Sequence, residues 1–210
     1  MKVGVLASGA GTNLQALLDR VHGREGVQIV AVASDKPGAR ALERARSAGV
    51  PEAAFPTARY EDRGARDEAI ADWLEERGVE LVVMAGYMRL LSPSFLARFP
   101  GRVINVHPAL LPAFPGLHAV QQAIDYGVKV FGVTVHFVDE GVDSGPVILQ
   151  RALELPSADD PDEVRQELRP LEHELLAEAV RLHARGALRI DPVNPRRTLT
   201  DLPAEATGDG

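Results

Sequence analysis

The sequence contains no cysteine among its 210 residues. This absence excludes disulfide bonds, thiolate metal sites and a cysteine nucleophile. Without a disulfide framework that would indicate an oxidising compartment, we expect the protein in the cytoplasm. The apolar start, MKVGVL, is interrupted by glycine too early for a signal peptide, and no apolar stretch is long enough to span a bilayer. We therefore expect no membrane association.

Positively charged residues are also in deficit. The chain has 23 Lys and Arg against 30 Asp and Glu, which gives a net charge of −7 at pH 7. A chain with this balance has no broad electrostatic attraction for nucleic acid, so we expect no nucleic-acid partner. Any anionic ligand has to be bound by a local site.

The length of the chain favours a single domain. Residues 1–190 carry the periodic apolar patterns, whereas 191–210 are polar and rich in proline and small residues. We predict one domain over 1–190 and a loosely ordered tail over 191–210.

The first half of the chain alternates short apolar runs with segments of helical periodicity. Valine-rich runs such as 27–33 are typical of buried strands, and the spacing of Leu14, Leu17 and Leu18 is typical of a helix. The predicted strands are 2–7, 27–33, 50–55, 79–85 and 102–106, and the predicted helices are 12–22, 39–48, 61–77 and 92–98. This order predicts an α/β fold, a Rossmann-like and mostly parallel twisted sheet with helices on both faces.

The pattern changes after residue 106. The remaining predicted elements are a proline-containing loop over 107–118, a helix over 119–126 and strands over 130–138 and 147–155. Glycines and a proline separate the last two strands, which favours a hairpin-like antiparallel pair in the C-terminal half. Asp160 and Pro161 begin a final long helix, which Pro170 is expected to kink.

A glycine-rich turn, SGAGTN at 8–13, lies between the first strand and the first helix. Its glycines let the backbone approach a ligand, and a helix start favours an anion. The pattern is neither G-x-G-x-x-G nor a P-loop. We favour a phosphate bound here, with side-chain donors from Thr12 and Asn13. A dinucleotide with Asp35 at its ribose, or a tight turn without a ligand, are the alternatives.

Two polar residues, Asn105 and His107, occupy the end of a predicted buried strand. Residues two apart on a strand face the same side, so both can point at one ligand. If the loop that carries Asp143 folds back beside His107, its carboxylate would raise the histidine pKa. Such a set suits acyl transfer, because Asn105 and His107 can donate hydrogen bonds to an oxyanion while Asp143 assists the imidazole.

A structural interpretation of the same residues is also open. A histidine at a strand end is often packed, and an aspartate before Ser-Gly-Pro is often a turn residue. We interpret His118 and His136 as structural. The histidine spacing does not favour zinc and no G-x-S-x-G motif is present, so we expect no metal and no serine hydrolase.

Four segments together carry a resemblance to a known family. They are SGAGTNL at 8–14, AGYMRLL at 85–91, NVHPALLP at 105–112 and VDSGPVI at 142–148. In this order they resemble the glycinamide ribonucleotide transformylases, members of the folate-dependent formyltransferases, over residues 1 to about 187. The Asn-x-His-Pro segment followed by Asp-x-Gly-Pro is specific for folate-dependent formyl transfer.

The resemblance implies transfer of the formyl group of 10-formyltetrahydrofolate to the amine of 5-phosphoribosylglycinamide in de novo purine biosynthesis. It implies small-molecule partners only, a monomer or homodimer, and catalysis by Asn105, His107 and Asp143. The implied acceptor-binding residues are Gly11, Thr12, Asn13 and Glu172. The implied folate-binding residues are Arg63, Met88, Arg89, Leu90, Leu91, Asn105, Asp139, Gly141 and Asp143.

The chain departs from the family pattern at three positions. Ala109 and Ala113 stand where many relatives carry Ser and Lys, and Pro170 puts the geometry around Glu172 in question. Three alternative functions stay open. A formyltetrahydrofolate deformylase would use water as the acceptor and normally carries a preceding regulatory domain. A methionyl-tRNA formyltransferase would need an RNA-binding extension. A non-catalytic phosphosugar-binding protein would need the glycine-rich turn but no catalytic set.

Overall fold

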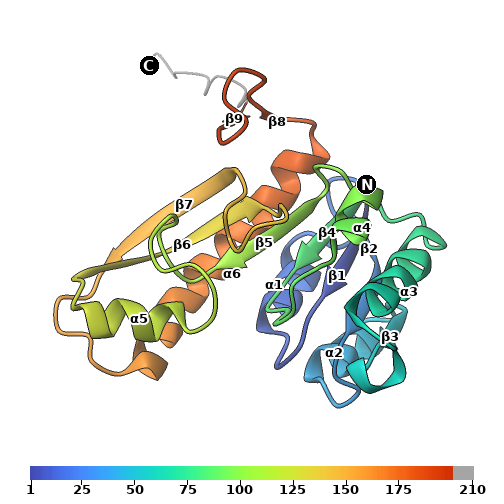
Figure 1. Ribbon diagram of the computed structural model, residues 1–210, viewed down its shortest axis with the longest axis horizontal. Coiled ribbons are helices and arrows are strands. Elements are labelled where there is room, and N and C mark those ends of the chain that lie inside the picture. Colours follow the sequence, from blue (N-terminus) through green and yellow to red (C-terminus); the bar gives the residue numbers. More distant parts are fainter. Residues whose placement is uncertain (201–210) are drawn as a thin grey trace.

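The structure, a computed structural model, describes residues 1–200. Its main sheet has seven strands in the order β3-β2-β1-β4-β5-β6-β7 (Figure 1). The strands are β1 (Lys2–Leu6), β2 (Gln28–Ser34), β3 (Glu52–Ala54), β4 (Leu81–Met84), β5 (Val103–His107), β6 (Val130–Phe137) and β7 (Val147–Glu154). The helices are α1 (Thr12–Arg20), α2 (Arg40–Ser47), α3 (Arg63–Glu75), α4 (Pro93–Arg98), α5 (Ala119–Tyr126) and α6 (Pro161–Ala184), and Thr57–Arg59 forms a 3-10 turn.

Strands β1 to β5 are parallel, whereas β6 pairs antiparallel with both β5 and β7. The predicted Rossmann-like sheet with an antiparallel part in its C-terminal half is therefore confirmed. Most of its strands are one to three residues shorter than the predicted runs, and loops follow them directly. These loops at the strand ends carry most of the candidate site.

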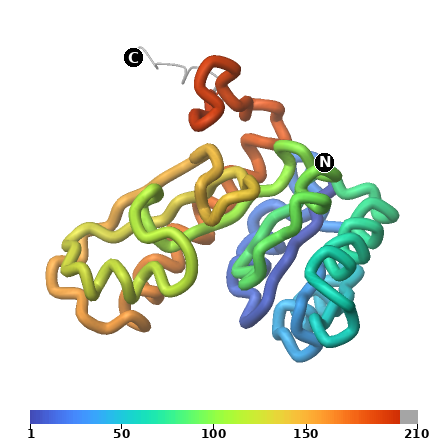
Figure 2. Tube along the Cα trace, viewed as in Figure 1, coloured from blue at the N-terminus to red at the C-terminus, as the bar shows by residue number. Residues whose placement is uncertain are grey.

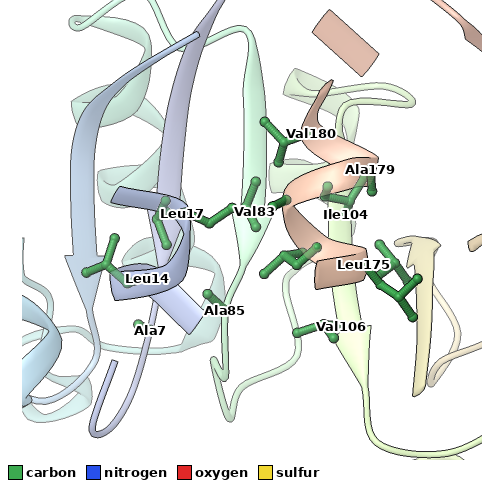
Figure 3. Close-up of a cluster of buried hydrophobic side chains, with 14 of the residues drawn as sticks. Ala7, Leu14, Leu17, Val83, Ala85, Ile104, Val106, Leu175, Ala179 and Val180 are labelled. Carbon is green, nitrogen blue, oxygen red and sulfur yellow. The ribbon is translucent and has the colours of Figure 1, made fainter. Parts of the chain in front are cut away.

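Helices cover both faces of the parallel strands. Val3 and Val5 of β1 belong to the core beneath α1 and α6, whereas Leu6 belongs to the core beneath α3 and α4. Successive strand residues point to opposite faces, so a strand buried on both sides reads as a continuous apolar run. Figure 3 shows part of the first core: Leu14, Leu17, Leu175, Ala179 and Val180 come from helices, and Ala7, Val83, Ala85, Ile104 and Val106 lie on or next to strands.

The helix starts follow the predicted cap signals. The Ser92 side chain accepts a hydrogen bond from the Phe95 amide at the start of α4, and Asp160 caps α6 in the same way through the Asp162 amide. α6 stays helical on both sides of Pro170. Proline cannot donate to the carbonyl four residues earlier. Pro170 and Gln166 are both exposed, so water can hydrate that carbonyl.

A small hairpin follows α6, with β8 (Leu188–Ile190) antiparallel to β9 (Thr198–Thr200). The Asp191 carboxylate accepts from Nε of Arg197 at 2.9 Å and from the Val193 amide at 2.8 Å. These bonds order 191–200, where a loosely ordered tail is expected from the sequence. Figure 2 shows the hairpin at one end of the molecule, where Arg197 forms a β-bridge with Val147 of β7. The rest of that tail, 201–210, lies outside the described residues.

No helix within residues 1–200 is long and apolar enough to cross a membrane.

Candidate active site

Three polar side chains meet where β5 and β6 run side by side. β5 carries Asn105 and His107, and the antiparallel register places Asn105 opposite His136 and His107 opposite Thr134. Nδ2 of Asn105 lies 3.2 Å from Nε2 of His136. His136, interpreted as structural from the sequence, is thus part of the site. The signal that could have found it is the strand pairing, which a single sequence does not show.

Asp143 comes back to these residues from the loop between β6 and β7. Its Oδ2 lies 3.3 Å from Nδ1 of His107 and accepts a hydrogen bond from the Gly116 amide at 2.8 Å. Its Oδ1 lies 3.4 Å from Nδ2 of Asn105 and 3.5 Å from Nε2 of His136. The structure therefore brings Asn105, His107 and Asp143 together, as the sequence suggested.

The backbone of this loop has little freedom. Asp143 adopts a positive φ of 50°, which is uncommon for a residue with a side chain. A Cβ at Gly145 would collide with the carbonyl oxygen of Phe137, so this position of the loop requires glycine. Local backbone geometry thus aims the Asp143 carboxylate at the histidines.

The hydrogen bonds define where protons lie. Nε2 of His107 is 2.8 Å from the carbonyl oxygen of Phe114, and Nδ1 of His136 is 2.8 Å from the carbonyl oxygen of Phe137. A carbonyl oxygen only accepts, so both nitrogens carry a proton. Nδ1 of His107 faces Asp143, and that contact is most favourable when the ring is an imidazolium.

The pKa values of the pair are shifted in the same direction. Burial opposes ionisation of Asp143, but hydrogen bonds from His136 and the Gly116 amide, together with the charge on His107, lower its pKa to about 2. Burial lowers the pKa of His107, although Asp143 and the Phe114 carbonyl favour its charged form. The expected raised pKa for His107 is therefore wrong. Its side chain is only 6% exposed, and this desolvation outweighs the carboxylate.

A solvent-open cavity of about 150 Å³ is lined by Asn105 and Asp143, whereas His107 is not among its lining residues. Its lining residues are Arg63, Met84, Leu90, Leu91, Pro93, Asn105, His136, Val138, Asp139, Glu140, Gly141 and Asp143. Seven of the nine residues that the resemblance implied for folate are among them. Met84, Pro93, His136, Val138 and Glu140 were not found from the sequence.

Two implied folate residues do not line this cavity. The Met88 side chain is exposed to solvent. Arg89 turns away and donates from Nε to Oδ2 of Asp35 at 2.9 Å. Asp35 is buried and engaged in this ion pair, so it is not available to a ribose. A dinucleotide bound at the glycine-rich turn would therefore lack the acidic residue that was expected at its ribose.

The glycine-rich turn lies at the start of α1. Gly11 has a φ of 70°, and a Cβ there would lie 2.7 Å from Cα of Ala41, so this position requires glycine. Asn13 is buried, and its Nδ2 donates to Oε2 of Glu172 on α6 at 3.0 Å. Oδ1 of Asn13 has no partner within the described residues. Burial raises the pKa of Glu172, and the bond from Asn13 partly opposes this effect. The turn and Glu172 therefore lie together despite Pro170.

The remaining histidine candidates add nothing to the site. His118 is exposed at the start of α5. Residues 1–200 contain no group of three or more His, Cys, Asp or Glu side chains arranged to hold a metal ion.

Known proteins share both this sequence and this fold. The formyl transferase family model matches residues 1–180. A phosphoribosylglycinamide formyltransferase from Mycobacterium tuberculosis is 46% identical over 176 residues, covering 84% of this chain and 81% of that protein. The one from Bacillus subtilis is 43% identical over 173 residues, covering 82% and 89%. The crystal structure of glycinamide ribonucleotide transformylase 1 from Symbiobacterium toebii superposes with a TM-score of 0.91 at 48% identity, covering 95% of this chain and 93% of that one. The chain therefore belongs to the formyl transferase family, in the branch whose members are named phosphoribosylglycinamide formyltransferase.

Proposed function

We propose that this protein transfers the formyl group of 10-formyltetrahydrofolate to the amine of 5-phosphoribosylglycinamide, in the de novo pathway to purines. One observation carries the proposal. The Asp143 carboxylate reaches both His107 and Asn105, and Asp143 and Asn105 line an open cavity. Such a cluster of hydrogen-bond donors beside a buried carboxylate is suited to an acyl-type reaction.

The donor is assigned to the cavity. Leu90 and Leu91 line one side and suit a flat ring, and the loop at 138–143 offers backbone groups to the polar edge of a pterin. Arg63 lines the same cavity with a positive charge, which suits the carboxylates of a folate tail.

The acceptor is assigned to the turn at the start of α1. Its phosphate would accept hydrogen bonds from the backbone of Gly11 and Thr12 and from Asn13. Glu172 lies beside Asn13 and would bind the sugar or the amine. The unpartnered, buried Oδ1 of Asn13 supports a ligand or solvent contact at this place.

The reaction then follows from the positions of these groups. The uncharged amine attacks the formyl carbon, and the carbonyl electron pair moves to the formyl oxygen. Asn105 and His107 donate hydrogen bonds to this oxyanion. The oxyanion collapses, the bond to the folate nitrogen breaks, and the amine proton passes through water to that nitrogen. Asp143 favours the charged imidazole, which strengthens the bond that stabilises the oxyanion.

His107 has to change one contact for this role. Its Nε2 donates to the Phe114 carbonyl and its Nδ1 faces Asp143, so neither nitrogen is free. His107 can reach the formyl oxygen when the loop around Phe114 shifts and releases Nε2. Cytoplasmic location, independence from metal, and assembly as a monomer or homodimer stay predictions.

The test mixes the purified protein with 10-formyltetrahydrofolate and 5-phosphoribosylglycinamide and follows folate absorbance. Turnover that depends on the amine supports the proposal. Release of formate at the same rate without the amine would identify a deformylase instead. Binding of the amine substrate without turnover would identify a binding protein.

A further inference from the structure

An irregular segment, 86–92, forms one wall of the cavity assigned to the donor. It connects β4 to α4, and Leu90 and Leu91 within it line the cavity. The segment has no regular secondary structure, so its backbone amides depend on acceptors elsewhere in the protein. Oγ of Ser8 accepts from the Met88 amide at 3.0 Å, and Asp67 of α3 accepts from the Ser92 amide.

Asp67 is the most buried of these anchors. Its Oδ2 accepts from the Ser92 amide at 2.7 Å, while its Oδ1 accepts from Nε and Nη2 of Arg66 at 3.0 and 2.7 Å. The side chains of Asp67 and Arg66 are 0% and 3% exposed. Removing two charges from water is costly, and a buried pair often gives no net stability over apolar residues of similar size. A gain in stability therefore does not explain why the ion pair of Arg66 and Asp67 is buried here.

The position of Asp67 on its helix supplies one. Arg63 lies four residues earlier on α3, on the same helix face, and lines the donor cavity. Ser92 directly follows Leu91, which also lines the cavity. The carboxylate of Asp67 thus connects two walls of the cavity, one on α3 and one on segment 86–92.

We propose that Asp67 is a positioning residue for the folate donor, with Arg66 as its counter-charge. Its bond to the Ser92 amide holds segment 86–92 against α3 and so sets the width of the cavity between Arg63 and Leu91. This inference rests on the proposed placement of the donor. Ser8 of the acceptor turn contacts this segment at Gly86 and Met88, whereas Asp67 holds its far end at Ser92, so we expect the larger effect on the donor.

Two double variants test this role without leaving an unpaired buried charge. Arg66→Met with Asp67→Leu removes the charges and the acceptor. Arg66→Met with Asp67→Asn removes the charges but keeps an oxygen that can accept from the Ser92 amide. We expect the leucine variant to raise the donor KM and the dissociation constant of tetrahydrofolate by about tenfold or more, because a small misplacement of a binding wall has large effects. The acceptor KM stays within about twofold, and the asparagine variant recovers most of the loss.

Hydrogen exchange at the Ser92 amide gives an independent measurement. Exchange should speed up in the leucine variant and stay slow in the asparagine variant. Leu74→Ala serves as a control, because Leu74 is fully buried seven residues after Asp67 on the same helix, close to Gly4 of β1. We expect it to lower the free energy of unfolding while leaving the ratio of the donor KM to the acceptor KM unchanged. Fast exchange at Ser92 with a wild-type tetrahydrofolate dissociation constant would overturn the proposal.

A second pair of variants tests the same hydrogen bond by changing its donor, the Ser92 amide. Ser92 has a φ of −74°, which proline can adopt, so Ser92→Pro removes the amide donor and the cap hydroxyl, and its ring also displaces the Asp67 carboxylate. Ser92→Ala deletes the cap hydroxyl alone. The proposal requires weaker tetrahydrofolate binding in the proline variant than in the alanine variant, and equal binding would overturn it.

Leu90→Asp separates this inference from the placement of the donor. Leu90 is half exposed and lines the cavity, so a charge there should weaken tetrahydrofolate binding. Unchanged binding would refute the placement itself. Weakened binding in Leu90→Asp with unchanged binding in the leucine double variant would refute only the role of Asp67.

Discussion

Replacing Asp143 by asparagine removes one charge and little else. The amide oxygen of asparagine can still accept from the Gly116 amide, so the loop keeps its main anchor. Two unit charges at the 3.3 Å that separate Oδ2 of Asp143 from Nδ1 of His107 interact by about 5 kcal/mol at an effective dielectric constant of about 20. The Asp143 side chain is 16% exposed, which makes this value an upper bound.

The loss of this charge lowers the pKa of His107 further, because burial then acts without opposition from the carboxylate. Proton transfer and charge stabilisation by such a pair contribute about 10²- to 10⁴-fold to the rate, or about 2.7–5.4 kcal/mol. We therefore expect kcat to fall by about 10²- to 10⁴-fold at neutral pH. The acceptor KM should change by less than about threefold, because the substitution leaves untouched the turn to which we assign the phosphate.

The same variant has a defined effect on stability. The pKa of Asp143 is lowered from its ordinary 3.8 to about 2, which corresponds to about 2 kcal/mol of folding free energy. A lowered folded-state pKa stabilises the fold above the unfolded value and loses this effect as the pH falls through the folded value. Asp143→Asn should therefore unfold at lower denaturant concentration at pH 7 and match the wild type near pH 2.

Steady-state kinetics, a proton NMR titration of His107 and urea unfolding at both pH values check these expectations together. A folded Asp143→Asn variant whose kcat stays within about fivefold of wild type would refute the assigned role of the carboxylate. An unchanged pKa of His107 would refute the electrostatic argument behind it.

Three further predictions concern other parts of the site and core. Gly145→Ala should lower kcat by at least about tenfold, because its Cβ displaces the Asp143 loop, whereas Gly38→Ala has open space and should be neutral in the same assay. Asn13→Ala should raise the acceptor KM about tenfold and leave the donor KM unchanged, which initial-rate kinetics with each substrate varied will show. Leu176→Ala, at a fully buried position of α6, should cost about 2–5 kcal/mol of unfolding free energy in urea titrations, and a loss below about 1 kcal/mol would contradict the packing described for this helix.

The order of the elements and several of their ends could be predicted from local signals alone. A cap residue followed by proline marks the starts of α4 and α6 in the sequence, and both starts lie at the predicted residues. Continuous apolar runs predict buried parallel strands because both faces of each strand are covered. These signals depend on residues close in the chain, which is why one sequence suffices to detect them.

The polar anchors of the cavity could not be predicted in the same way. Asp67 looks like one of several charged residues on a surface helix, yet its side chain is fully buried against Arg66 and the Ser92 amide. Arg89 looks like a ligand contact after a buried strand, yet it pairs with Asp35. Ser92 is 25 residues from Asp67 in the sequence, and Asp35 is 54 residues from Arg89. Residue type and spacing do not show which residues pair over such sequence separations.

The reversal of direction at β6 explains why a loop has to bring Asp143 to Asn105 and His107. Because β6 runs antiparallel to β5, it ends opposite Ile104, near the start of β5, and not beside His107 at its end. The chain that leaves β6 therefore has to fold back to carry the Asp143 carboxylate to His107. The positive φ at Asp143 and the close passage of Gly145 over the Phe137 carbonyl are the local consequences of this return. These local features carry the carboxylate to both histidines, so variants of this loop should impair both catalysis and, through the lost Asp143 interactions, folding stability.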